Sequence, residues 1–317
     1  MKYKESHGLQ ISAFSLGTVQ LGLNYGISNT SGKPTTEQAF AILDRAMALG
    51  VNHLDTSNDY GDSERTVGSW LQTRAEDRRP LVTTKIGHLC LDSEAALEKD
   101  VRAQVEGCLE RLGLTQIPVL MLHNFEEYAA RPEWMQRIFR KLKDEHLIRM
   151  SGISAYSRHD YDVMAASGFD AVQIPLNIFD WGKLLDGSIQ RLAAAGLAVF
   201  VRSAFLQGLV FRDPEKLEPE MAFCRTTLEK FRALCADFHL QPAELALSFL
   251  LTLPEVTGLV LGCETVAQVE SNAALIDSTV QLTDAQMEAV RAAFQDTDPR
   301  VLNPSCWHNA IGAVPAK

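Results

Sequence analysis

The chain has 317 residues, of which 46% are hydrophobic and 22% charged, so it can bury a large core and is too apolar to be disordered. Forty Asp and Glu against thirty Lys and Arg give a formal charge of −10, which argues against nucleic acid or an anionic membrane as the main partner. The charged start lacks the apolar run of a signal peptide, and no segment has the roughly 20 apolar residues of a membrane span, so we expect a cytoplasmic location.

Strand-like and helix-like segments alternate along the chain. Residues 1–12 predict a short hairpin that turns at Gly8. Most of the strand-like runs that follow are continuous apolar stretches, which suit strands buried on both faces. The eight runs are Ala13–Thr18, Val51–Asp55, Leu81–Lys85, Ile117–His123, Met150–Ser154, Ala171–Leu176, Ala198–Arg202 and Gly258–Gly262.

Between these runs, apolar residues recur at helical spacing, as at Leu97, Val101, Val105, Cys108 and Leu112. Capping boxes predict helix starts at Thr35–Gln38, Thr265–Gln268 and Thr283–Gln286. A long loop is predicted over Leu206–Met221, followed by helices over Cys224–Phe238 and Pro242–Leu253. The eighth run precedes a helix at Asp284–Phe294 and a tail, Asp298–Lys317, that we expect to be irregular.

Eight strands that alternate with helices predict an α/β fold, a (β/α)8 TIM barrel with an N-terminal hairpin cap and an additional C-terminal helix. No linker divides residues 1–317, so we expect a single domain. A doubly wound sheet is the competitor. It usually shows Gly-x-Gly-x-x-Gly after its first strand, whereas Leu16–Gly22 lacks this pattern and predicts no helix there, so the sequence favours the barrel.

The six cysteines are scattered without a Cys-x-x-Cys pair. This spacing predicts reduced thiols rather than a disulfide framework, and no metal site. They are Cys90, Cys108, Cys224, Cys235, Cys263 and Cys306.

Polar side chains gather at the predicted strand ends, where barrels of this type build their active sites. They are Asp55, Lys85, His123, Ser154 and Gln173, with Tyr60 in the loop after Asp55. A buried Lys or Asp is costly unless paired, so we expect Asp55 and Lys85 to pair. Taken alone, His123 is explained as a core histidine, Lys85 as an ion-pair partner and Tyr60 as a loop aromatic. Their convergence at one barrel mouth favours a catalytic site instead.

These residues resemble the aldo-keto reductase family, and the resemblance covers essentially the whole chain. The matching text is Leu54-Asp55-Thr56-Ser57, Tyr60-Gly61-Asp62-Ser63-Glu64, Thr84-Lys85 and Leu122-His123-Asn124. The resemblance implies that Asp55, Tyr60, Lys85 and His123 form the family's catalytic tetrad. It also implies cofactor contacts from Thr18, Asp55, Ser154, Gln173, Gly262, Cys263, Glu264, Gln268 and Asn272.

The resemblance implies an NAD(P)(H)-dependent oxidoreductase that interconverts a small aldehyde, ketone or sugar-like carbonyl compound and its alcohol. A reduced nicotinamide would give hydride to the carbonyl carbon while Tyr60 gives a proton to the oxygen. A phenol pKa near 10 is too high for easy proton exchange at neutral pH. Lys85, held charged by Asp55, would lower that pKa, and His123 would orient the substrate oxygen.

Two positions depart from the family pattern. Ala155 follows Ser154 where the family often has a Ser-Asn pair, and Arg202 occupies the position of an aromatic that stacks on the nicotinamide. Arg202 either stacks on that ring or meets an anionic group of the cofactor or substrate. The resemblance places Ser203, Leu206 and Gly208 on the pyrophosphate, although an ordinary glycine-bearing loop explains them as well.

Glu264 stands where NADP-preferring members often have a basic residue, and this favours NAD(H) over NADP(H) unless Lys33 or Arg212 supplies charge. Gln268 and Asn272 resemble adenine contacts, although Gln268 also suits the capping box. Candidate residues lining the substrate pocket are Asn58, Asp59, Phe179, Trp181, Trp307 and His308.

Two other functions remain open from the sequence. A barrel lysine can form a Schiff base with a carbonyl compound, which would make the protein an aldolase that uses Lys85. Asp55 argues against this, because it holds the ammonium charged. A non-catalytic nicotinamide-binding sensor or regulatory subunit is the other alternative.

Overall fold

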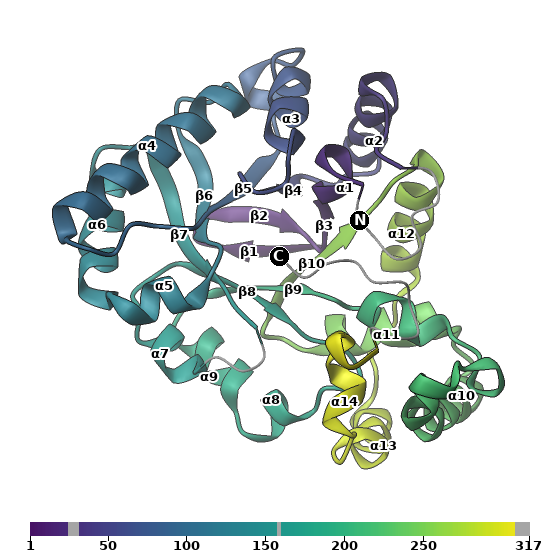
Figure 1. The fold of residues 1–317 in the computed structure, drawn as a ribbon. Helices are drawn as coiled ribbons and strands as arrows, with labels where there is room; N and C mark the ends of the chain where they lie inside the picture. Colours follow the sequence, from purple (N-terminus) through teal and green to yellow (C-terminus); the bar gives the residue numbers. More distant parts are fainter. Residues whose placement is uncertain (25–31, 157–159, 308–317) are drawn as a thin grey trace.

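The structure is a computed structural model that describes residues 1–24, 32–156 and 160–307. Eight parallel strands close into a barrel in the order β10-β3-β4-β5-β6-β7-β8-β9, with helices arranged around it (Figure 1). Every predicted run overlaps one strand, so the predicted (β/α)8 barrel is confirmed. The strands are β3 Phe14–Gly17, β4 His53–Asp55, β5 Leu81–Ile86, β6 Ile117–Leu122, β7 Ile148–Ser154, β8 Ala171–Pro175, β9 Ala198–Arg202 and β10 Val256–Gly262.

The predicted N-terminal hairpin is present as β1 (Tyr3–Ser6) and β2 (Leu9–Ser12), paired antiparallel. Its two turn residues, His7 and Gly8, both have positive φ values, 50° and 68°, as a two-residue turn between twisted strands requires. Ile11 of β2 is buried among residues of the barrel interior such as Val119 and Met150. The hairpin therefore closes the end of the barrel at which the strands begin.

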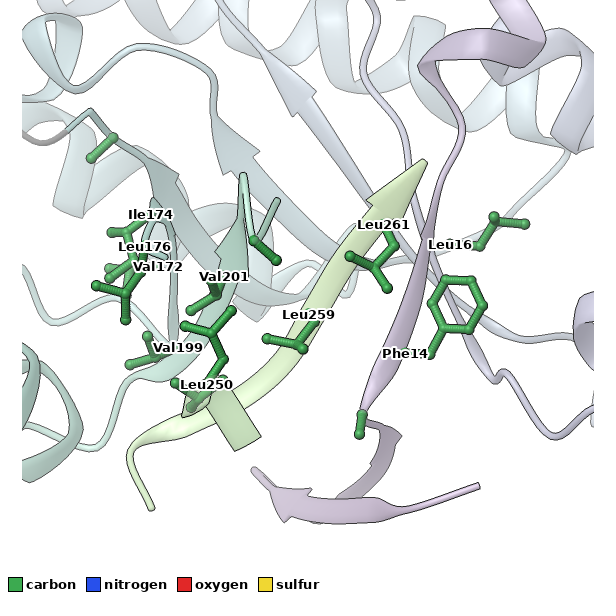
Figure 2. Close-up of a cluster of buried hydrophobic side chains, with 14 of the residues drawn as sticks. Phe14, Leu16, Val172, Ile174, Leu176, Val199, Val201, Leu250, Leu259 and Leu261 are labelled. Carbon is green, nitrogen blue, oxygen red and sulfur yellow. The ribbon is translucent and has the colours of Figure 1, made fainter. Parts of the chain in front are cut away.

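Side chains alternate along the strands between the barrel interior and the surrounding helices. Figure 2 shows part of the outer core, in which Leu250 of a helix joins strand residues: Phe14, Leu16, Val172, Ile174, Val199, Val201, Leu259 and Leu261. The same alternation turns His53 and Asp55 of β4, and Thr83 and Lys85 of β5, toward the interior. The barrel interior is thus apolar near the hairpin and polar near the strand ends.

The helices follow the predicted pattern in most places. All five apolar residues predicted for one helix are buried on α4. Thr35 and Thr283 form complete capping boxes, whereas at Thr265 only the hydroxyl half is made. The longer helices are α2 Thr36–Ala48, α3 Ser63–Leu71, α4 Glu94–Leu112, α5 Phe125–Ala130, α6 Pro132–Asp144, α9 Ser188–Ala194, α10 Arg225–Phe238, α11 Pro242–Thr252, α12 Val266–Ser278 and α13 Asp284–Phe294. The shorter ones are α1 Val19–Gly22, α7 Tyr161–Ala165, α8 Gly182–Leu185, α14 Pro299–Leu302 and the 3-10 helix η1 Glu76–Arg78.

Three local predictions were wrong. A short helix, α1, opens at Val19, where none was expected. This helix packs closely against the Tyr60 turn, since a Cβ on Gly22 would lie 1.8 Å from the Tyr60 carbonyl oxygen. The predicted long loop consists largely of the 3-10 helices η2 Leu206–Phe211, η3 Pro214–Lys216 and η4 Pro219–Cys224, two of which start at prolines that preset φ.

The expected irregular tail contains α14 and the 3-10 helix η5 (Pro304–Trp307). Asp298 caps α14 by accepting from Arg300 N, and Pro299 occupies its first turn. His308–Lys317 lie outside the described residues. In the described part of the chain, no helix is both long and apolar enough to cross a membrane.

Candidate active site

Asp55 and Lys85 form a buried ion pair at the ends of neighbouring strands. Lys85 Nζ lies 2.7 and 2.8 Å from the two Asp55 carboxylate oxygens and donates a third hydrogen bond to Thr56 O at 2.9 Å. Lys85 is 0% and Asp55 3% exposed. Burying two charges is costly, and here all three ammonium hydrogens have oxygen acceptors. The ion pair predicted from the sequence is present.

Burial lowers the pKa of Lys85, while the Asp55 carboxylate opposes this by favouring the charged amine. Arg202 also lowers the pKa of Lys85, so a second cation lies within electrostatic range of the pair. Gln173 of β8 donates from Nε2 to Asp55 Oδ2 at 2.7 Å. The Asp55 carboxylate is therefore held by residues of two different strands.

The Tyr60 ring contacts both Lys85 and His123. Lys85 Nζ lies 5.1 Å from the ring centroid, and the His123 ring meets Tyr60 edge-on, with centroids 5.8 Å apart at 80°. These contacts place a buried ammonium group and an imidazole beside the Tyr60 ring. The four residues predicted to converge, Asp55, Tyr60, Lys85 and His123, thus lie together at the strand ends.

Tyr60 lies on a tight turn that begins at Ser57. Tyr60 N donates to Ser57 O at 3.1 Å, and Asn58 N donates to Lys85 O at 3.1 Å, which ties the turn to β5. Asn58 Nδ2 donates to Gln104 Oε1 on α4 at 2.9 Å. Backbone and side-chain hydrogen bonds therefore fix the position of Tyr60.

The residue before Tyr60, Asp59, connects this turn to His123 at the end of β6. Asp59 Oδ2 lies 3.0 Å from His123 Nδ1, and Ser57 Oγ lies 3.2 Å from the same nitrogen. The exposed His88 ring is 3.5 Å from Asp59. The hydrogen bond from His123 lowers the pKa of Asp59, so the carboxylate is anionic at neutral pH.

A polar layer lies beneath the ion pair and was not singled out from the sequence. His53, two residues before Asp55, contacts Ser15 Oγ at 2.7 Å through Nδ1 and Thr83 Oγ1 at 2.8 Å through Nε2. Burial lowers the pKa of His53 to about 4, so the ring is neutral at pH 7. The strand period of two is the signal that places His53 on the face of Asp55.

Glu64 is a second buried polar residue. It stands in the motif that follows Tyr60, but its structural role was not predicted from the sequence. It is 1% exposed, accepts from Thr84 Oγ1 at 2.5 Å and pairs with Arg111 Nε at 2.6 Å. Thr84 directly precedes Lys85. Glu64 therefore anchors α3, which follows the Tyr60 turn, to the strand that carries Lys85.

Several residues that were predicted to contact the cofactor form hydrogen bonds or strand pairs within the protein. Thr18 is fully buried, and its Oγ1 donates to Asp55 O at 2.9 Å. Ser154, at the end of β7, and Gln173, in the middle of β8, are register partners, and both are buried. Thr18 is thus placed to hold the end of β4, while Ser154 and Gln173 lie at the strand-end face beside the ion pair.

Arg202 ends β9 and stacks on a tyrosine that follows β7. Its guanidinium carbon lies 4.5 Å from the Tyr156 ring centroid, and its Nη2 donates to Ala155 O at 3.0 Å. No described Asp or Glu forms an ion pair with Arg202, and the undescribed ranges contain neither residue type. Among the described residues, the Arg202 guanidinium is therefore held by ring stacking and one backbone hydrogen bond rather than by a carboxylate.

The segment after β9 turns sharply. Ser203, Leu206, Gln207 and Gly208 all have positive φ values, from 44° to 89°. Leu206 N and Gly208 N donate within the segment, whereas no acceptor among the described residues receives the N–H groups of Ser203, Ala204 and Phe205. Successive unpaired N–H groups in such a turn form a concave anion site.

At the end of β10, Gly262 and Gly17 are register partners on neighbouring strands. A Cβ on Gly262 would lie 2.4 Å from the Gln20 amide nitrogen, so a larger residue there would displace the Gln20 side chain. Cys263 is buried and receives a hydrogen bond from Asn272 at 3.3 Å. Gln268 accepts from Glu264 N at 2.6 Å, which occupies its side-chain oxygen in the helix start.

Glu264 lines a cleft of about 230 Å³ whose wall contains no Lys or Arg. Its lining residues are Gly32, Pro34, Gln38, Ala41, Ile42, Glu264, Thr265 and Val266. Of the two alternative cations, Lys33 pairs with Asp62 at 2.7 Å and Arg212 pairs with Glu218. Burial raises the pKa of Glu264.

Most of the residues predicted to line a substrate pocket lie elsewhere. Phe179 is fully buried in the apolar core, where its ring meets the rings of Phe231 and Phe294 edge-on. Trp181 and Trp307 are also in the core. Asn58 faces α4 and lines an outer cleft of about 410 Å³ with Gly61, Ala103, Gln104 and Arg111. Asp59 lies at the site, and His308 is outside the described residues.

The chain is similar to known proteins over most of its length. The model of the Aldo/keto reductase family matches residues 13–295. The chain belongs to the aldo/keto reductase family. As a member of this family, whose general activity is carbonyl reduction, it is an oxidoreductase.

Two relatives and one solved structure match this chain over nearly its whole length. The chain is 27% identical over 300 residues to L-galactose dehydrogenase of Arabidopsis thaliana, with 89% of this chain and 91% of that protein covered. It is 24% identical to the uncharacterized oxidoreductase YqkF of Bacillus subtilis, with 90% and 93% covered. The solved aldo-keto reductase AKR11C1 of Bacillus halodurans, in its holo form, has a TM-score of 0.75 at 20% identity and covers 96% of this chain and 100% of its own. This structure shares the barrel fold.

Proposed function

We propose that the protein interconverts a small carbonyl compound and its alcohol with a nicotinamide cofactor, and that Tyr60 is the proton donor in reduction. The observation that carries this proposal is the contact of the Tyr60 ring with both Lys85 and His123 at the strand ends. A phenol beside a buried ammonium group is suited to give up a proton near neutral pH.

Each residue of the tetrad has a separate task. Tyr60 donates a proton to the carbonyl oxygen, and the positive charge of Lys85 stabilises the phenolate that remains. Asp55 keeps Lys85 charged and fixed through two hydrogen bonds. His123 hydrogen-bonds the substrate oxygen and orients it. In the oxidative direction the Tyr60 phenolate accepts the proton of the alcohol.

The residues at the mouth fit a dinucleotide cofactor, which when bound supplies or accepts the hydride. The unpaired N–H groups of Ser203, Ala204 and Phe205 suit a pyrophosphate. Ser154 and Gln173 offer polar groups for the nicotinamide amide, and Gly262 presents bare backbone. In this proposal Leu206 and Gly208 shape the turn, while Cys263, Glu264, Gln268 and Asn272 face the adenosine half. Thr18 supports the site indirectly through Asp55.

Of the two roles considered for Arg202, anion binding has the stronger support. Tyr156 already occupies one face of the guanidinium, and no described Asp or Glu forms an ion pair with it. Arg202 also ends β9, the strand that leads into the turn at Ser203 with its unpaired N–H groups. We therefore assign Arg202 to an anionic group of the bound molecules rather than to stacking on the nicotinamide ring.

The proposal favours NAD(H) over NADP(H). Glu264 would repel a phosphate on the adenosine ribose, and the two cations that offered an alternative, Lys33 and Arg212, are engaged with Asp62 and Glu218. An aldolase mechanism has weak support, because a Lys85 ammonium that donates three hydrogen bonds has no free lone pair with which to attack a carbonyl carbon.

Fluorescence titration of the purified protein with NADH and NADPH, followed by turnover of a carbonyl panel, tests this proposal. The panel includes aldoses, since a relative is named for L-galactose. We expect saturable binding with NADH the tighter ligand, and oxidation of NADH with at least one carbonyl compound. Binding without any turnover would favour the sensor function instead. Borohydride trapping of a substrate on Lys85 without nicotinamide would favour the aldolase.

A further inference from the structure

Asp59 is not a member of the tetrad, but it contacts the tetrad histidine, His123. Its Oδ2 lies 3.0 Å from His123 Nδ1, on the side of the ring where Ser57 Oγ lies at 3.2 Å. An ionised carboxylate can only accept hydrogen bonds. The proton of this contact must therefore sit on His123 Nδ1, which decides the tautomer of the ring.

The second ring nitrogen, Nε2, has no hydrogen-bond partner among the described residues. Because Nδ1 carries a proton in both the neutral and the charged ring, only the proton on Nε2 changes between the two states. Nε2 is therefore the nitrogen that can face a substrate oxygen, and it donates to that oxygen when it carries the proton.

Asp59 also directly precedes Tyr60 in the chain. Asp59 N donates to Ser57 Oγ at 3.2 Å, inside the turn that Tyr60 N closes on Ser57 O. The carboxylate of Asp59 therefore links the turn that carries Tyr60 to β6, the strand that leads into His123. The mutual position of the phenol and the imidazole depends on this link.

We propose that Asp59 is a positioning residue: it accepts the hydrogen bond of His123 Nδ1–H, turns Nε2 toward the substrate oxygen, and fixes His123 relative to Tyr60. This inference rests on the proposed carbonyl–alcohol function of the site. It assigns the hydrogen-bonding task of His123 to a single nitrogen.

Nitrogen-15 NMR of the histidine rings tests the tautomer without turnover. The spectrum is recorded near pH 8, where a free imidazole is neutral, and His123 is assigned by the signal lost in His123→Gln. In the wild-type protein we expect a pyrrole-type Nδ1 and a pyridine-type Nε2. In Asp59→Ala the Ser57 hydroxyl is free to donate to Nδ1, so Nδ1 becomes pyridine-type. A pyridine-type Nδ1 in the wild-type protein would overturn the proposal.

Kinetics test whether Asp59 acts through His123. Asp59→Ala is expected to lower kcat for reduction about tenfold to a hundredfold, with the Kd of NADH unchanged. In the His123→Gln background the same substitution should cost no more than about twofold. The matched control is His88→Gln, which removes the exposed second neighbour of Asp59 and should keep the wild-type rate.

An undiminished Asp59→Ala cost in the His123→Gln background would show that Asp59 does not act through His123 and would overturn the proposal. Asp59→Asn is the second variant, because its amide oxygen still accepts from Nδ1–H and should restore part of the rate. If the wild-type protein turned over no carbonyl compound, the proposed function would fail, whereas the NMR result would still decide the tautomer.

Discussion

Gln173 Nε2 lies 2.7 Å from Asp55 Oδ2, the same oxygen that accepts from Lys85 at 2.8 Å. A residue of β8 thus shares an acceptor with the lysine of β5. Because a hydrogen bond to a charged group contributes about 1.5–3 kcal/mol, the orientation of Asp55 depends on Gln173 as well as on Lys85. A residue predicted as a cofactor contact is therefore also part of the support of the ion pair.

Gln173→Leu is expected to lower kcat for reduction about tenfold, because Asp55 loses a donor and Lys85 becomes less firmly held. Steady-state kinetics with a saturating carbonyl substrate measures this effect. Gln72→Leu is the matched control, since Gln72 is exposed and donates only to Gly113 O on the outside of the barrel. Equal rates for the two variants would argue against a role for Gln173 in holding Asp55.

Tyr60→Phe should reduce the rate of carbonyl reduction by about 10²- to 10⁴-fold, the usual contribution of a general acid. The ring and its contacts with Lys85 and His123 are kept, so the Kd of NADH should change little. Turnover and fluorescence titration measure the two effects separately. Unchanged turnover would refute the acid role of Tyr60.

Asp55→Asn leaves the Lys85 ammonium buried without a counterion, and we expect the free energy of unfolding to fall by about 3–5 kcal/mol. Lys85→Met should cost similarly, by leaving the carboxylate unpaired. The double variant Asp55→Asn/Lys85→Met removes both charges and should be more stable than either single variant. Urea unfolding gives all three values, and simple additivity would contradict a tightly coupled pair.

His53 should make the protein less stable in mild acid. Its pKa is about 4 in the folded protein, below the unfolded value of 6.5, so folding favours the neutral ring. This contribution is fully present above pH 6.5 and is lost as the pH falls toward 4, a difference of about 3 kcal/mol. Urea midpoints measured between these pH values should fall less steeply in His53→Gln. His146→Asn, at an exposed histidine, is the control and should keep the wild-type slope.

Glu264→Arg should shift cofactor preference toward NADPH by replacing repulsion of the 2′-phosphate with attraction. The ratio of the Kd values of NADH and NADPH, obtained by fluorescence titration at low salt, is the measurement. Ser271→Arg adds one positive charge on the exposed side of α12 and should leave the ratio unchanged. An unchanged ratio in Glu264→Arg would show that Glu264 does not face the ribose.

The barrel and the convergence of the tetrad were predictable because both follow from short-range patterns. The continuous apolar runs predicted the strands, and the polar residues at the ends of most runs marked the mouth. Parallel strands bring their ends together, so Asp55, Lys85 and His123 had to meet. The partner of His123 was not predictable, since nothing in the chain order shows that Asp59 turns toward β6.

Packing decided the features that sequence patterns did not indicate. Phe179 and Trp307 are aromatic residues near loops, which suggested a pocket, yet the core absorbs both. The segment from Leu206 is rich in turn residues and was expected to be a loop, whereas its prolines and left-handed residues fold it into 3-10 turns. The surroundings of Arg202 could not be predicted from the sequence, because they depend on where each described Asp and Glu lies in the fold.

The N-terminal hairpin limits how protons reach the catalytic groups. Ile11 and the apolar interior residues Val119, Met121, Met150 and Phe200 fill the barrel below the polar layer. Such a plug offers no chain of hydrogen-bonding groups from the solvent on that side. Tyr60 and Lys85 must therefore exchange protons with bulk water through the mouth alone, and a molecule seated there would cut that route for as long as it stays bound.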